Sequence, residues 1–249
     1  MKTFYQTDDA PVGGIEPQEQ PNTLSVGQRI VSVFTNPKAV FESLKMKPDF
    51  LTPLIIGAIL MFLFMFVNAD LVRQESIDNI QKNEKLTEEM RENQIAGLEQ
   101  LSQGQVMMFF VAIPVAGMVV VYFIMGLIYL VVGNFIMGGK GSYTQILSIY
   151  GYSSLIIGIV ALAVKWLLVA TTGTLHVYTS IAALLPLEQE KTFLFQFLDL
   201  FDIFYLWFTY VLGMGYAILY GWELKKGLIM TFGLYFLYGL GKAALTALF

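Results

Sequence analysis

Four ionisable side chains interrupt otherwise apolar stretches of the chain: Lys165, Asp199, Asp202 and Lys242. A charge left unpaired at the centre of a bilayer costs about 2.5–3.5 kcal/mol on insertion scales, so such residues usually have a purpose. The i,i+3 spacing places Asp199 and Asp202 on one face of a helix. Because two charges of each sign are present, we expect all four to converge in a neutral cluster that joins three membrane helices.

This intramembrane charge cluster supports three hypotheses. The first, which we favour, is a structural link between helices. The second is a cation or proton site in a transport path. The third is that the lysines extend to the membrane surface, which leaves the aspartates free to bind a cation or a polar headgroup.

Residues typical of catalytic and metal sites are sparse. His176 is the only histidine, and cysteine is absent. With Glu188 and Glu190, His176 could form a weak oxygen-rich site for a divalent cation, but the spacing matches no metal motif, so we favour a solvated loop. We therefore predict no enzyme activity, no metal and no cofactor. A net charge of −4 without a basic run argues against nucleic acid as a partner.

The elements that must position these residues are long uncharged tracts. Hydrophobic residues make up 56% of the 249, which lies well outside the range of soluble domains. Stretches of 18 or more apolar residues predict helices that cross a membrane. The fold class predicted is an all-α integral membrane protein with about five transmembrane helices and N-terminal amphipathic interfacial helices. The spans are expected at 50–67, 106–135, 145–169, 193–220 and 228–245, with a helical outer loop at 70–105.

The chain is expected to divide into three parts. Residues 1–24 are rich in Pro, Gln and acidic residues and should form a disordered cytoplasmic tail. Residues 25–49 carry apolar stripes with helical spacing and should form interfacial helices. Residues 50–249 form the five-span membrane domain. Within it, 171–189 is apolar but rich in threonine, which favours a surface or re-entrant segment over a sixth span.

Small residues recur at i,i+4 in three predicted spans, where they allow helix backbones to approach closely. Packing inside one bundle is the default interpretation, and homo-oligomerisation through one of these ladders is the alternative. The ladders are Ser154 with Gly158, Gly213 with Ala217 and Gly221, and Gly239 with Ala243.

Basic residues near the ends of the spans suggest an orientation, because cytoplasmic loops are enriched in Lys and Arg. The two very short loops are basic, and they fall on the same side as the basic helix that precedes the first span. This favours a cytoplasmic N-terminus and a C-terminus on the outside. The inner lysines are then Lys38, Lys45, Lys47, Lys140, Lys225 and Lys226.

Three short sequence patterns carry a family resemblance. Phe34, Pro37 and Phe41 form a Phe-x-x-Pro-x-x-x-Phe pattern before the first span, and Asp49 and Pro53 follow at its entry. In the third span, Gly151 and Tyr152 begin a Gly-Tyr-x-x-x-Pro element in which Ile156 replaces the proline. In these patterns the chain resembles the prokaryotic branch of the Yip (Ypt-interacting protein) membrane-domain family.

The resemblance implies a function without catalytic chemistry. Eukaryotic members of the family are linked to Rab-type GTPases and to membrane traffic, but a prokaryotic chain has no Rab cycle. We therefore expect a membrane adaptor or organiser of partner proteins or lipid, located in the plasma (inner) membrane of a prokaryote. Its partners would be the lipid bilayer and a protein bound at the cytoplasmic N-terminal region, with contacts expected at Val33–Pro53 and at the short inner turns. The alternative is a small transporter, channel or lipid-moving protein that uses Asp199 and Asp202 with Lys165 and Lys242.

Overall fold

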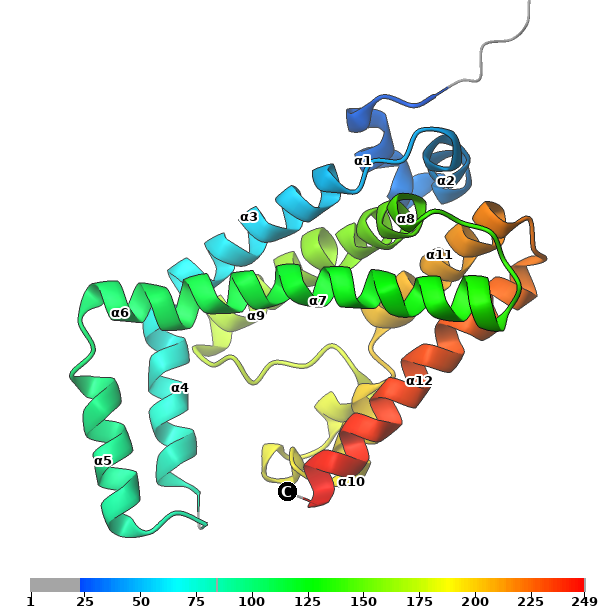
Figure 1. Cartoon of the computed structure of the whole chain (residues 1–249). Coiled ribbons are helices and arrows are strands. Elements are labelled where there is room, and N and C mark those ends of the chain that lie inside the picture. The colour runs from blue at the N-terminus through cyan, green and yellow to red at the C-terminus, as the bar shows by residue number, and fades with distance from the viewer. Residues whose placement is uncertain (1–22, 84, 249) are drawn as a thin grey trace, which may run out of the picture.

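The computed structural model describes residues 23–83 and 85–248, and within these residues all regular secondary structure is helical (Figure 1). The predicted tail at 1–24 lies almost entirely outside the described residues. The α-helices are α1 (Val26–Thr35), α2 (Pro37–Met46), α3 (Leu51–Val67), α4 (Ala69–Gln81), α5 (Glu88–Glu99), α6 (Gln103–Met107), α7 (Ile113–Leu130), α8 (Tyr143–Leu155), α9 (Leu162–Thr172), α10 (Phe193–Asp199), α11 (Ile203–Tyr220) and α12 (Leu224–Leu248). Three π-helical turns and two 3-10 turns complete them: η1 (Met108–Ala112), η2 (Val131–Ile136), η3 (Ile156–Ala161), η4 (Ile181–Leu184) and η5 (Leu187–Gln189).

Four continuous helices are long and apolar enough to cross a membrane. They cover Gln103–Ile136, Tyr143–Thr172, Ile203–Tyr220 and Leu224–Thr246. The pair α3 and α4, which is bent by 67°, passes the same test as one unit and brings the number to five. The predicted class, an all-α integral membrane protein with about five spans, is confirmed.

The predicted span at 193–220 is interrupted, which corrects the expectation of one continuous helix. α10 ends at Asp199, and α11 begins only at Ile203. Asp202 has an extended backbone, and its carboxylate accepts hydrogen bonds from the amides of Phe204 (2.8 Å) and Tyr205 (3.0 Å). A carboxylate that caps the first amides of a helix starts a new helix, because it satisfies donors that have no partner inside the helix.

The N-terminal helices form where local signals start them. Ser25 and Gln28 form a capping box at the start of α1, and Asn36 caps α2, whose first residue is Pro37. The two helices pack against α8 and α11 (Figure 1). Their inward side chains belong to the main hydrophobic core. The fully buried side chains of this pair are Val33, Val40, Phe41 and Leu44. The expected interfacial helices are therefore also part of the bundle.

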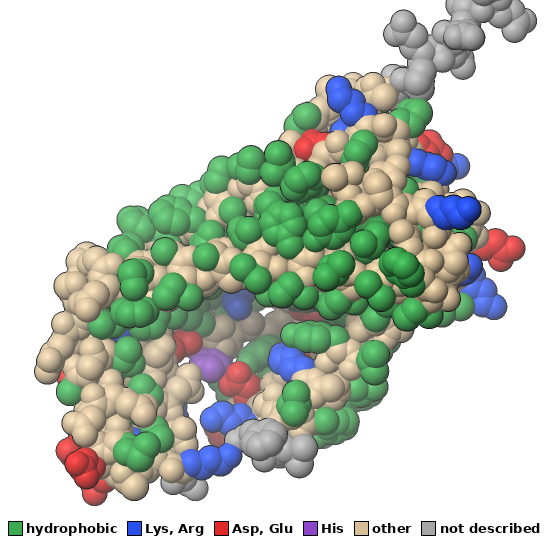
Figure 2. All heavy atoms as spheres, in the orientation of Figure 1, with side chains coloured by type: hydrophobic (Ala, Val, Ile, Leu, Met, Phe, Trp, Pro, Cys, Tyr) green, Lys and Arg blue, Asp and Glu red, His purple; other side chains and the backbone are tan. Residues whose placement is uncertain are grey.

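The short loops meet the N-terminal helices at one end of the molecule. The Lys45 ammonium donates to the carbonyl of Ile218 (3.1 Å), and Lys226 donates to the carbonyl of Met137 (3.0 Å). We call this region the helix-pair end. It consists of α1, α2 and the two short loops at residues 137–142 and 221–223. Lysine side chains gather over it in Figure 2.

The opposite end carries the polar segments. α4 and α5 lie side by side as a helical hairpin, as Figure 1 shows, where the sequence predicts a helical outer loop. The chain leaves α9 at Gly173, whose φ of 70° is the left-handed conformation that favours glycine. Residues 173–192 then contain only 3-10 turns, so they form no span-length helix. We call this region the hairpin end.

Candidate functional site

The family-pattern residues meet where the N-terminal helices join α3 and α8. The Tyr152 hydroxyl donates to Oδ2 of Asp49 at 2.8 Å, across 103 residues of sequence. The other carboxylate oxygen of Asp49 accepts from the amide of Thr52 at 3.2 Å, at the start of α3. Asp49 thus ties the first turn of α3 to the last turn of α8.

A buried arginine completes this region. Arg29 of α1 is 3% exposed, and its guanidinium donates to Oγ of Ser43 at 3.0 Å. Its positive charge also acts on the Tyr152 side chain, which donates to Asp49. The Arg29 Nε has no hydrogen-bond partner in the described part of the chain. Arg29 is not among the site residues predicted from the sequence, although its i,i+4 spacing to the core residue Val33 places both on one face.

The side chain of Pro53 on α3 packs directly against Gly151 on α8. A Cβ atom on Gly151 would lie 2.6 Å from Cγ of Pro53 and would collide with the Tyr122 hydroxyl. That hydroxyl is fixed by hydrogen bonds to the carbonyls of Phe50 (3.1 Å) and Leu147 (2.7 Å). Only glycine fits at 151 without moving these groups. Ile156, at the position of the family's proline, begins the π turn η3.

The aromatic residues of the first pattern anchor the helix pair. Phe34 contacts Trp207 edge to face at 6.2 Å between ring centroids. Phe41 is fully buried, and a Cβ atom on Gly215 of α11 would lie 3.2 Å from its ring. Pro37 begins α2.

We define the motif junction as Arg29, Ser43, Asp49, Pro53, Gly151 and Tyr152.

Comparison with family models identifies the family of this chain. The Yip1 domain model matches residues 31–245, which is nearly the whole chain and covers the candidate spans except for the last residue of the final one. The chain belongs to the Yip1 domain family. Searches of curated proteins and of solved structures found no match. All the pattern residues, from Phe34 to Tyr152, lie inside the matched part of this Yip1 domain, and Arg29 lies two residues before it.

The four intramembrane charges of the Yip1 domain do not form the predicted cluster. Among the described residues, no ion pair joins Lys165 or Lys242 to an aspartate, and both lysine side chains are exposed. Asp199 and Asp202 lie near each other, but hydroxyl groups hold them instead. Ser180 donates to Asp199 at 2.8 Å, and Thr179 donates to Asp202.

The physical reason for this correction is the break between α10 and α11. Asp202 is 8% exposed and sits at the positive end of the α11 dipole, where two amides stabilise its charge. The segment after α9 supplies Thr179 and Ser180, so a lysine partner is not needed. The contacts of Asp199 and Asp202 are compatible with the first hypothesis, a structural role, but Lys165 and Lys242 take no part in them.

His176 has one of the two partners that the sequence suggested, Glu190, and it has Glu75 in place of Glu188. Its Nδ1 lies 3.0 Å from Oε2 of Glu190, and its Nε2 lies 3.7 Å from Oε2 of Glu75 on α4. Glu75 also accepts hydrogen bonds from Thr174 and from the amide of Leu175 (2.6 Å). Glu188 is exposed and takes no part. In the described ranges, no group of three or more His, Asp or Glu residues is arranged to hold a metal ion.

Tyr178 strengthens the same region. Its hydroxyl donates to Oε1 of Glu190 at 2.6 Å. Burial raises the pKa of Tyr178 above its usual value, and the hydrogen bond and charge of Glu190 raise it further. The residues Glu75, His176, Tyr178 and Glu190 therefore connect the α4–α5 hairpin to the segment after α9 through side-chain contacts.

The small-residue ladders divide into close contacts and open positions. A Cβ atom on Gly213 would lie 2.7 Å from Thr231, and one on Gly239 would collide with Leu200. A Cβ atom on Gly227 would lie 2.9 Å from Cβ of Ala217. Ala243 is fully buried. The expected packing role does not hold for two ladder residues. Gly158 faces open space, and Gly221 ends α11 with a φ of 67°. Ser154 bonds back to the carbonyl of Gly151.

Proposed function

We propose that this Yip1 domain protein is a non-enzymatic membrane adaptor that presents the outer face of α1 to a partner protein. The observation that carries the proposal is the motif junction. It joins α1 to α2 through the buried Arg29 and Ser43, and it joins the start of α3 to α8 through Asp49 and Tyr152. A rigid surface loses little conformational entropy when a partner binds, so it suits a docking role.

The outer face of α1 is suited to contact with a protein. Val31 is 65% exposed, and the exposed Gln28 and Thr35 lie three and four residues from it on the same helix face. Scattered polar residues with a small apolar centre are typical of interfaces that form and dissociate. This face points away from α8 and α11, because Arg29 and Val33 on the opposite side are buried.

The orientation completes the proposal. We propose that the protein lies in the plasma membrane of a prokaryote and that its helix-pair end faces the cytoplasm, because the predicted inner lysines gather at that end. The absence of cysteine makes the test direct. Single cysteines at Thr35 and at Gln94 should react on opposite sides of the membrane with an impermeant thiol reagent. Labelling of both residues from one side would contradict the assignment.

The adaptor role is tested by cross-linking in native membranes. A photoreactive amino acid at Val31 should give a defined protein adduct, identified by mass spectrometry, with a yield that falls at least tenfold when Gln28 and Thr35 are both replaced by Glu. The same probe at Leu167, which is also 65% exposed, is the matched control and should give no such adduct. Lipid adducts alone at Val31 would overturn the proposal.

Deletion of the N-terminal region would be a poor test. Val33, Val40, Phe41 and Leu44 are fully buried, so removal of residues 1–49 would expose the core of the bundle. A partner lost after that deletion would report unfolding as well as docking. Substitutions on the exposed face avoid this ambiguity.

A further inference from the structure

An open groove with a volume of about 1040 Å³ lies at the helix-pair end, between α2 and the turn from α11 to α12. Its walls are largely apolar. Met214 and Ile218 come from the last turns of α11, and Leu224 begins α12. Both helices are candidate spans, so the apolar wall continues toward the region that lipid chains occupy.

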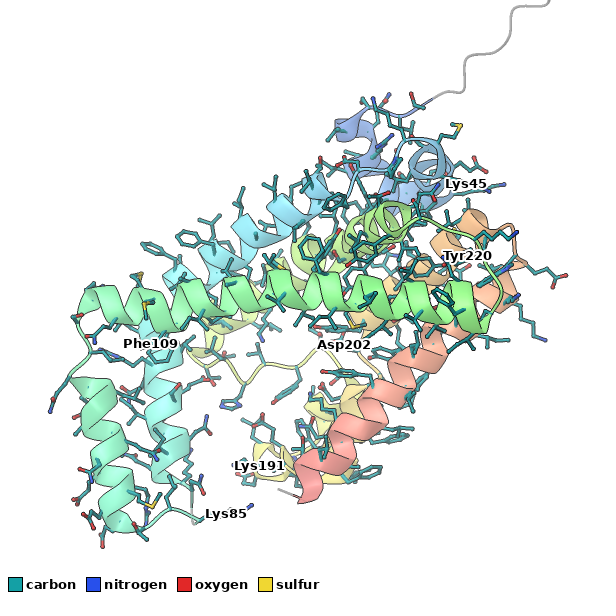
Figure 3. All side chains as sticks on the ribbon, in the orientation of Figure 1. Lys45, Lys85, Phe109, Lys191, Asp202 and Tyr220 are labelled. Atoms are coloured by element: carbon teal, nitrogen blue, oxygen red, sulfur yellow. The ribbon has the colours of Figure 1, made fainter. Side chains whose placement is uncertain are left out.

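The rim of this groove is charged. Lys38 and Lys45 line it, together with Glu42 and Gln145. Figure 3 shows Lys45 on α2 at the same end of the molecule as Tyr220. The Lys38 side chain is 72% exposed and lies 3.9 Å from Glu42, which is a loose contact. The rim therefore keeps a net positive charge, with Lys38 available to a ligand.

Aromatic residues place the groove at the level of lipid headgroups. Trp222 lines the groove and stacks on Tyr220 at 4.3 Å between ring centroids. The Lys226 ammonium lies 4.2 Å from the centroid of the Trp222 ring. Trp and Tyr are enriched at the membrane–water interface, and lysines on the cytoplasmic side attract anionic lipids.

From this arrangement we propose that the groove binds one anionic phospholipid, with its phosphate between Lys38 and Lys45 and an acyl chain along Met214, Ile218 and Leu224. A positive rim above an apolar wall matches an amphiphile with a negative head. The volume lies at the upper end of the range for small-molecule sites, which fits a headgroup with part of one chain. The lipid site does not depend on the adaptor role, because α1 does not line the groove.

The test measures retained lipid by native mass spectrometry of the full chain, released from vesicles of equal parts phosphatidylglycerol and phosphatidylcholine. We expect one phosphatidylglycerol molecule to be retained in clear preference to phosphatidylcholine. Each of Lys38→Gln and Lys45→Gln should lower the retention about fivefold, which corresponds to about 1 kcal/mol per lysine near a lipid surface. Glu42→Gln should raise it, because a competing negative charge is removed.

Lys140→Gln is the matched control. It removes the same charge from an exposed position at the helix-pair end, outside the groove, and should leave the retained lipid unchanged. Equal retention of the two lipids, or an equal loss in Lys140→Gln, would overturn the proposal. Lys38→Gln keeps the test valid if Lys45→Gln fails to fold, because Lys45 also bonds to Ile218.

A photoreactive group at Leu224 identifies the occupant directly. Leu224 is 40% exposed and lines the groove, so the probe should form an adduct with the mass of a phospholipid. An adduct with a protein, or with a second copy of this chain, would overturn the lipid assignment.

Discussion

Different kinds of interaction stabilise the helix-pair end and the hairpin end of this Yip1 domain. At the helix-pair end, α1 and α2 bury apolar side chains against α8 and α11, and the hydrogen bonds Arg29–Ser43 and Tyr152–Asp49 add to this burial. At the hairpin end, α5 has no buried residue, and carboxylates hold the irregular segment after α9. Apolar burial stabilises in proportion to area, whereas carboxylate contacts contribute about 1–3 kcal/mol each and depend on geometry. The helix-pair end should therefore set the stability of the fold.

The largest effect should come from the core of the helix-pair end. Phe41→Ala removes a fully buried ring beside Gly215, so we expect a loss of about 3–5 kcal/mol in the free energy of unfolding. The unfolding midpoint in a mixture of mild detergent and SDS measures it. Phe135→Ala is the control, because that ring is 80% exposed and should change little. Equal shifts in both variants would remove the basis of the comparison.

The next largest effect is expected at Gly151, a residue of the family pattern. Gly151→Ala places a methyl group against Pro53 and the fixed Tyr122 hydroxyl, and we expect a loss of about 1–3 kcal/mol. Gly158→Ala is the same change on the same membrane helix, but it faces open space. It should be neutral, or stabilising by up to about 1 kcal/mol, because alanine favours helix. Detergent–SDS unfolding of the two variants side by side tests the difference, and equal stability would refute the close contact.

A smaller effect is expected at the break between α10 and α11. Asp202→Ala removes the cap of α11 and should cost about 0.5–2 kcal/mol. Asp202→Asn keeps a capping oxygen and should cost less. Hydrogen exchange at Phe204 and Tyr205 reports the cap directly, and unchanged exchange in Asp202→Ala would contradict it. Ion flux through liposomes that depends on Asp202 would instead revive the transport hypothesis.

The smallest effect on overall stability should come from Glu75 at the hairpin end. Glu75→Gln weakens the contacts with His176, Thr174 and the Leu175 amide, so hydrogen exchange should increase at 174–177 while the unfolding midpoint stays nearly constant. Glu92→Gln, on the exposed face of α5, is the control and should change neither. A large fall in the midpoint for Glu75→Gln would show that the hairpin end is as important as the core.

Much of the fold could be predicted from the sequence. Four of the five expected spans correspond to continuous helices or to α3, because membrane helices are apolar over a length that the bilayer sets. The starts of α1 and α2 follow from Ser25, Asn36 and Pro37, which act within one turn of their own position. The family resemblance also followed from short local patterns, and the match over residues 31–245 confirmed it.

Only the tertiary structure decided the partners of the polar side chains. Asp202 meets Thr179 and not a lysine, and Arg29 is buried beside Ser43 and Tyr152. These contacts join segments without a shared periodicity, and spacing along the chain does not fix where such segments approach. The same limit applies to the glycines. Gly151 and Gly158 are the same residue type on one continuous membrane helix, but only at Gly151 does the packing of α3 against α8 leave no room for a side chain. Local chemistry determines which helices form, and the path of the chain in space determines which side chains meet.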